Sequence, residues 1–143
     1  IYGISSLPGT HLAPVASLKC KILQIKTLSP EDGTIGYGRY GHIAKGGTTI
    51  ATIPVGYADG IDRRLGSGKA SFSLNGHRVP TIGNICMDMC MLDVTGVDAK
   101  VGDTVTIFGE DPTVTEIAGI LGTIPYEIMT SIPRRIERIV LRK

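Results

Sequence analysis

Tight-turn sequences recur along the chain and leave room only for short strands between them. Asn75-Gly76 is the strongest of these signals, because both residues accept the positive φ of a two-residue hairpin turn. The flanking runs 70–74 and 77–82 are therefore predicted to pair as a hairpin. Because strands joined by tight turns pair antiparallel, we predict a mainly β domain, an antiparallel barrel or sandwich-like fold.

The whole chain is predicted to contain about eight short strands and two or three short helices. Besides the hairpin, strands are expected at 18–28 (with a possible bulge), 34–40, 48–55, 85–94, 104–108 and 135–141. Thr113 and Glu116 form a capping-box pattern that opens a short helix. A second helix is expected at 125–129, and one helical turn capped by Asp59 at 59–65.

Composition narrows the functional classes. The 143 residues suffice for one domain, and a net charge of +2 without tryptophan argues against a nucleic-acid-binding surface. No run is long and apolar enough to predict a membrane span, and no signal peptide is visible. Three cysteines without a framework pattern predict reduced thiols and a cytoplasmic setting. Since the chain begins at Ile1, we expect an excised or processed piece of a longer protein.

Two glycine-rich motifs imitate nucleotide-binding sites and fail on their context. The 36–41 segment matches Gly-x-Gly-x-x-Gly, but a dinucleotide site needs a helix next, and 48–55 is typical of a strand. The 66–69 segment imitates a phosphate-binding loop, yet Arg63 replaces its first glycine and Ala70 its final serine or threonine. Neither motif predicts a nucleotide site.

The cysteine- and methionine-rich segment is predicted to be structural. On a strand, Cys86 and Cys90 share one face, as buried thiols, and the three methionines of 87–91 form a stripe that is more often core than site. Asp88 on the cysteine face should meet a hydrogen-bond donor. The scattered histidines and the cysteine spacing predict no metal site.

Three tyrosines, Tyr37, Tyr57 and Tyr126, are the remaining candidates for chemistry. A tyrosine in a strand usually packs and leaves its hydroxyl at the surface. It acts as a general base only where positive charge lowers its pKa from about 10. The residues alone leave both roles open.

Several short motifs follow one another in order over almost the whole chain. They are Ile1-Tyr2-Gly3, Ile35-Gly36-Tyr37-Gly38, Pro54-Val55-Gly56-Tyr57-Ala58-Asp59-Gly60, Ile85-Cys86-Met87-Asp88 and Thr123-Ile124-Pro125-Tyr126-Glu127. Each is weak alone, but the ordered set is specific. Together they resemble the C-terminal domain of bacterial alanine racemases.

The resemblance implies an architecture and an activity. The family joins an N-terminal (β/α)8 barrel, which carries pyridoxal 5'-phosphate, to a mainly β C-terminal domain, and interconverts L- and D-alanine for peptidoglycan synthesis. A barrel needs about 250 residues, so 1–143 is expected to be the C-terminal domain, with 1–10 as the tail of the missing barrel. A cytoplasmic homodimer is implied, in which this domain faces the partner's barrel.

The resemblance also assigns roles to residues. The family uses two bases on opposite faces of the substrate: a barrel lysine and a tyrosine from the partner subunit, which corresponds to Tyr37. Met87 is implied in substrate binding and Tyr126 in approaching the cofactor phosphate. Residues implied in the substrate entrance corridor are Tyr57, Arg63 and Asp88. Asn84 stands where the family often has arginine, which changes the charge of the corridor.

The implied cofactor is expected to bind mainly to the missing barrel. Lys45 and Lys69 lie in predicted turns and do not correspond to the lysine that carries it. Two other functions compete with this reading. One is a small β-barrel binding module of the OB or translation-factor type without catalytic activity, and the other is a purely structural dimerisation domain.

Overall fold

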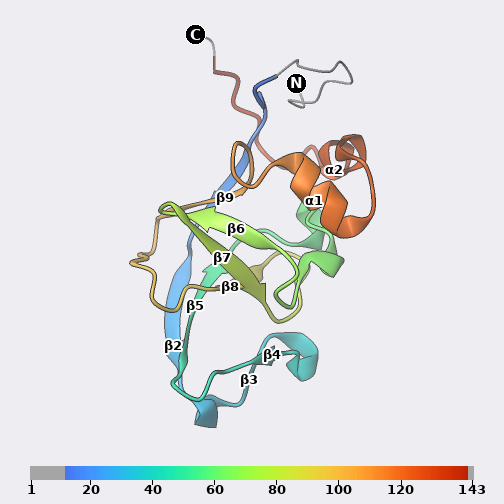
Figure 1. Cartoon of the computed structure of the whole chain (residues 1–143). Helices are drawn as coiled ribbons and strands as arrows, with labels where there is room; N and C mark the ends of the chain where they lie inside the picture. The colour runs from blue at the N-terminus through green and yellow to red at the C-terminus, as the bar shows by residue number, and fades with distance from the viewer. Residues whose placement is uncertain (1–11, 142–143) are drawn as a thin grey trace.

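The computed structural model describes residues 12–141. Nine strands and two helices lie in this range: β1 (Leu18–Lys21), β2 (Gln24–Leu28), β3 (Thr34–Ile35), β4 (Gly41–His42), β5 (Thr48–Ile53), β6 (Ser71–Leu74), β7 (His77–Ile82), β8 (Cys90–Asp93), β9 (Thr104–Phe108), α1 (Val114–Leu121) and α2 (Pro125–Ser131) (Figure 1). The fold is mainly β, as predicted. The expected barrel tail at 1–10 lies outside the described residues.

Seven strands form one curled sheet in the order β1-β9-β6-β7-β8-β5-β2, and neighbouring strands are antiparallel. The predicted single strand at 18–28 is wrong, because the chain bends between β1 and β2. Ile22 N–H donates to the Asp103 carbonyl at 3.0 Å, whereas Leu23 N–H donates to the Thr52 carbonyl at 2.9 Å. The two halves therefore pair with opposite ends of the sheet, which gives the barrel-like curl.

The predicted hairpin is confirmed as β6 and β7. Leu74 pairs with His77, and the turn residues Asn75 and Gly76 have φ of 49° and 79°. Inward-facing residues of this sheet make the core, including Phe72, which is fully buried. Burial of a side chain of this size stabilises the fold by about 1.5–3 kcal/mol.

The first helix begins and ends where the sequence predicts. The Thr113 hydroxyl accepts a hydrogen bond from Glu116 N–H at 3.1 Å, and Gly122 ends the helix with φ of 69°. Ile117 and Ala118 on its inner face belong to the main core. The second helix runs to Ser131, two residues beyond the prediction. No helix in the described range is long and apolar enough to cross a bilayer.

A separate two-stranded ribbon, β3 with β4, extends beyond the main sheet (Figure 1). The predicted strand at 34–40 is wrong after Ile35: a 3-10 turn, Tyr37–Arg39, joins the two short strands. Gly36 and Gly38 both have φ of 74°, which an extended strand does not allow. The glycines thus end the strand and turn Tyr37 outwards.

Three further local predictions differ from the structure. Only Cys90–Asp93 of the predicted strand 85–94 is extended, and the described part of 135–141 forms no strand. The turn expected at 59–65 is two 3-10 turns, and the second, Arg63–Leu65, is capped by Asp62. Asp59 instead accepts the Gly56 N–H that enters the first turn, at 2.9 Å.

Candidate functional site

The turn that carries Tyr37 holds its side chain away from the core. Tyr37 is 77% exposed although its neighbour Ile35 is buried. Gly36 fits closely, since a Cβ built on it would lie 2.9 Å from the Cε of Met91. Asn84 Nδ2 donates to the Tyr37 carbonyl at 3.0 Å, which ties the turn to a loop 47 residues away.

A groove of about 670 Å³ lies beside this tyrosine. Its lining residues are Tyr37, Tyr57, Arg63, Asn84, Ile85, Cys86 and Met87. Four of the six site residues implied by the resemblance, Tyr37, Tyr57, Arg63 and Met87, thus line one groove. Asp88 lines an adjoining groove of about 680 Å³ that also contains Tyr37 and Met87. Tyr126 lines neither groove.

Backbone contacts hold the Tyr57 turn against the Met87 loop. Tyr57 N–H donates to the Cys86 carbonyl, and Ala58 N–H donates to the Met87 carbonyl, both at 3.0 Å. Gly56 makes this approach possible, because a Cβ there would lie 2.3 Å from both carbonyl oxygens. The glycine is therefore a packing requirement of the groove wall.

Arg135 joins the same two segments through their acidic residues. Its guanidinium lies 2.7 Å from Asp59 and 2.8 Å from Asp88. The hydrogen bonds that Arg135 donates to the carboxylates of Asp88 and Asp59 raise the pKa of its guanidinium. The hydrogen-bond donor predicted for Asp88 is thereby confirmed, but the sequence did not identify Arg135 as that donor. No local sequence signal identified this pair, because Arg135 and Asp59 are 76 positions apart and the burial of Asp59, which is only 5% exposed, is a property of the fold.

Comparison with known proteins identifies the family of this chain. The family model described as alanine racemase, C-terminal domain, matches residues 15–140. The chain belongs to the alanine racemase C-terminal domain family. An alanine racemase from Aquifex pyrophilus is 41% identical over the whole chain and 42% of its own length, and one from Desulfovibrio desulfuricans is 45% identical over 90% of the chain and 34% of its own length. The chain thus spans less than half of these relatives.

Solved racemase structures share the fold. The alanine racemase from Bartonella henselae with covalently bound pyridoxal phosphate has a TM-score of 0.86 and 34% identity over 96% of this chain and 39% of its own. The racemase from Bacillus anthracis with bound L-Ala-P has a TM-score of 0.84 and 35% identity over 99% of this chain and 38% of its own. Both support the curled sheet with two helices as the racemase C-terminal fold.

Two of the three methionines in the stripe of the racemase domain are not core, contrary to the prediction. Met87 and Met89 are 55% and 47% exposed, because the segment before β8 is not extended. Met91 alone packs on a small cluster around Ile35. Cys90 is buried, as predicted, and burial raises its pKa, whereas Cys86 lies off the strand and is only partly buried.

Tyr126 lies on α2 and is 50% exposed. The next residues on the helix, Glu127 and Ile128, line a third groove together with Tyr57 and Arg63. Its role toward a cofactor stays a prediction.

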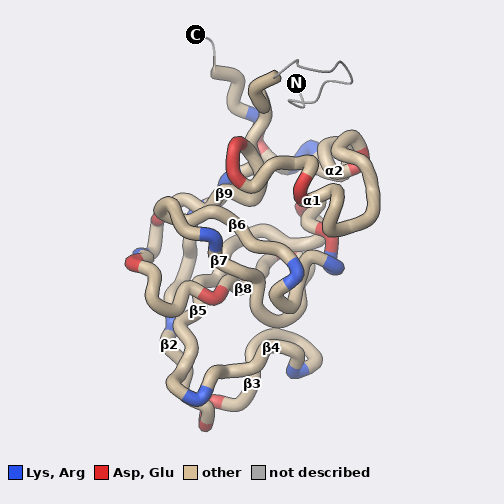
Figure 2. Tube along the Cα trace, in the orientation of Figure 1, with Lys and Arg blue, Asp and Glu red and all other residues tan. Residues whose placement is uncertain are grey.

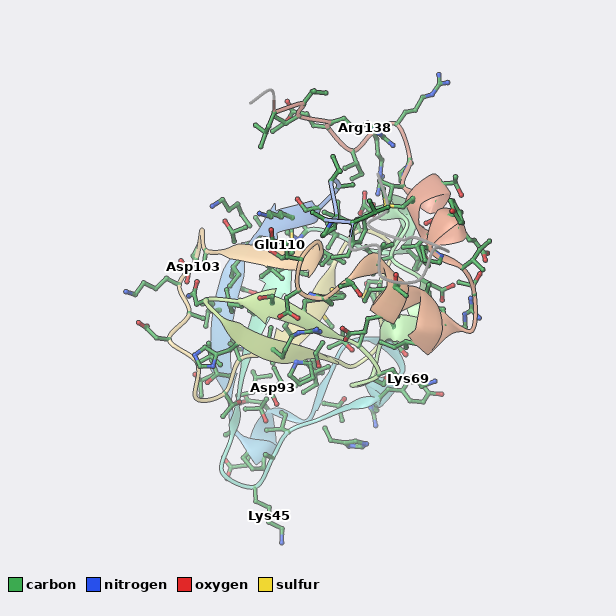
Figure 3. All side chains as sticks on the ribbon, turned by 45° about the horizontal axis from the view of Figure 1, so that its top comes forward. Lys45, Lys69, Asp93, Asp103, Glu110 and Arg138 are labelled. Carbon is green, nitrogen blue, oxygen red and sulfur yellow. The ribbon has the colours of Figure 1, made fainter. Side chains whose placement is uncertain are left out.

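Figure 2 shows basic and acidic residues interspersed along the trace in that view. Lys45 and Lys69 point away from the domain (Figure 3), and neither lines the two Tyr37 grooves. Among residues 12–141, no three His, Cys, Asp or Glu side chains are grouped to hold a metal ion.

Proposed function

We propose that this domain forms one wall of an alanine racemase active site, in which Tyr37 transfers the Cα proton of alanine. The observation that supports this proposal is the exposed phenol of Tyr37, which lies on a turn bounded by glycines and lines one groove with Met87 and Arg63. Inversion at Cα requires proton removal on one face and proton return on the other. We assign the L-alanine side to Tyr37 and the opposite side to a group in the rest of the enzyme.

The residues present fit part of a pyridoxal phosphate site. The groove of about 670 Å³ is lined by two phenols and one guanidinium and by no lysine, whereas the adjoining groove of about 680 Å³ has one lysine, Lys26. We infer that this wall covers a cofactor that the rest of the enzyme holds covalently. When bound, the cofactor withdraws electrons and acidifies the Cα–H bond of an amino acid. On this wall we assign Met87 to contact the substrate and Tyr126 to approach the cofactor phosphate. We assign Tyr57, Arg63 and Asp88 to the entrance corridor.

Arg63 suits a carboxylate substrate. Its guanidinium is the one charged group among the residues lining the groove. A positive charge in a groove attracts an anionic ligand. Tyr37 would accept the α-proton of L-alanine and, in the reverse direction, donate a proton to Cα from the same face.

We further propose that a second copy of the enzyme covers this groove. Tyr37, Met87 and Met89 are large side chains that line the two Tyr37 grooves and stay exposed, and such groups together mark surfaces that become buried on association. The site would then be shared between two subunits. D-Alanine made there would serve peptidoglycan synthesis in the cytoplasm.

The test is Tyr37→Phe in the full-length racemase that contains this chain. Because L- and D-alanine are equally stable, kcat/KM must fall equally in both directions, by about 10²–10⁴-fold for loss of a general base. Solvent exchange distinguishes the two faces. In D₂O the variant should exchange the α-proton of D-alanine for deuterium without inversion, because the other base still acts. It should not exchange the α-proton of L-alanine.

Tyr40→Phe is the matched control, since Tyr40 is an exposed tyrosine three residues away that lines neither groove. It should retain full activity. Equal α-proton exchange from both enantiomers in Tyr37→Phe would refute the assignment of Tyr37 as the base for L-alanine.

A further inference from the structure

The position of the Tyr37 phenol is set by its backbone. The side chain is 77% exposed, so packing within the domain does little to restrain it. Gly36 and Gly38 flank it with φ of 74°, and glycine has the widest conformational freedom of any residue. A turn of this kind needs a contact with another segment of the chain to hold one conformation.

Asn84 supplies such a contact. Its Nδ2 donates to the Tyr37 carbonyl at 3.0 Å, and within residues 12–141 no other side chain makes a hydrogen bond to the backbone of the 36–38 turn. The amide also lies against the turn, because a Cβ built on Gly38 would be 3.6 Å from this nitrogen.

The backbone beneath Asn84 is itself held in place. Gly83 is buried with φ of 67°, and a Cβ on it would lie 2.8 Å from the Ile35 carbonyl oxygen. The same loop continues to Met87, which lines the groove with Tyr37 and Asn84. Asn84 thus connects the turn of the phenol to the loop that forms the opposite part of the groove wall.

We propose that Asn84 is a positioning residue that keeps the Tyr37 phenol at a constant place relative to the Met87 loop. The inference rests on the proposed role of Tyr37 in proton transfer. A reacting group displaced by about 1 Å loses much of its rate, so release of the turn slows the Tyr37 step and leaves substrate binding nearly unchanged.

The experiment uses Asn84→Ala and Asn84→Leu in the full-length racemase. Leucine has about the size of asparagine and brings no charge into the groove, but its side chain cannot donate to a carbonyl. Both variants should lower kcat roughly tenfold, which is the rate change that corresponds to the free energy of one hydrogen bond. KM should change less than about twofold.

Isotope effects distinguish positioning from a loss of folded enzyme. With α-deuterated L-alanine, a slower Tyr37 step makes proton abstraction more rate-limiting and raises the primary isotope effect. With α-deuterated D-alanine the other base abstracts first, so the effect falls. A smaller fraction of active enzyme lowers the rate and leaves both isotope effects unchanged, which would overturn the proposal.

Asn75→Gly is the matched control. Asn75 Nδ2 also donates to a backbone carbonyl, that of Asp98 at 3.0 Å, and glycine accepts its φ of 49°. This variant should retain kcat and both isotope effects. If Tyr37→Phe abolishes racemisation while both Asn84 variants keep their kcat and isotope effects, the inference about Asn84 fails and the proposed function stands. If Tyr37→Phe also remains active, both fail.

Discussion

Gly56 packs directly against the carbonyl oxygen of Cys86, so closely that a Cβ on Gly56 would lie 2.3 Å from that oxygen. This approach allows Tyr57 N–H to bond the same carbonyl at 3.0 Å. The groove wall therefore depends on the absence of a side chain at one position.

Gly56→Ala is expected to lower the free energy of unfolding by about 1–3 kcal/mol, the cost of overpacking. The displaced loop should also weaken activity, because Met87 follows Cys86. Urea unfolding measures the effect on stability. Gly119→Ala is the control: nothing lies within 4 Å of its Cβ in the middle of α1, so it should raise stability by about 1 kcal/mol. Equal stability of the Gly56 variant and the unmodified protein would contradict the close packing.

Arg135→Ala is expected to lower the melting temperature and raise KM. The change leaves Asp59 buried without its cation and releases Asp88. Thermal unfolding and steady-state kinetics measure both effects. Arg134→Ala is a matched control, because no ion pair is recorded for Arg134 within the described range. Equal behaviour of the two alanine variants would show that Arg135 does not hold the groove wall.

Asp62 is expected to make the domain sensitive to acid. Its hydrogen bonds with the Arg64 side chain lower its pKa in the folded state. A lowered pKa gives stability that is complete above the unfolded value of about 3.9 and is lost as the pH falls through the folded value. Asp62→Asn keeps the cap of the 63–65 turn and should lose less stability than the unmodified protein between about pH 4 and pH 2. Identical acid unfolding curves would contradict the shift.

Cys20 is expected to resist thiol reagents in the folded protein. Burial raises its pKa to about 12, so at pH 8 only roughly one molecule in ten thousand carries the reactive thiolate. Mass spectrometry after brief treatment with iodoacetamide should find Cys20 and buried Cys90 unlabelled. After unfolding in urea, both should label. Rapid labelling of Cys20 in the native protein would show that β1 opens readily.

Local signals in the sequence predicted local structure well. Asn75-Gly76 specified its hairpin, and Thr113 with Glu116 specified the start of α1, because each depends on residues only a few positions apart. The antiparallel pairing followed from the short turns. These features need no knowledge of distant partners.

Features that depend on distant partners were missed. The segment 18–28 has continuous strand character, and its bend at Ile22 arises because Asp103 and Thr52 belong to opposite ends of the sheet. Met87 and Met89 have the pattern of a strand, but the contacts of the Tyr57 turn hold their backbone in a loop. Only the ordered family motifs implied that Tyr37, Tyr57 and Met87 belong to one site.

The bend between β1 and β2 also affects how the domain meets other molecules. It leaves the main sheet with two outer strands of only four and five residues, which carry Lys19, Lys21 and Lys26. Short outer strands with lysines discourage the addition of a strand from another chain. Aggregation by sheet extension is therefore disfavoured, which is compatible with the proposed association through side chains around Tyr37.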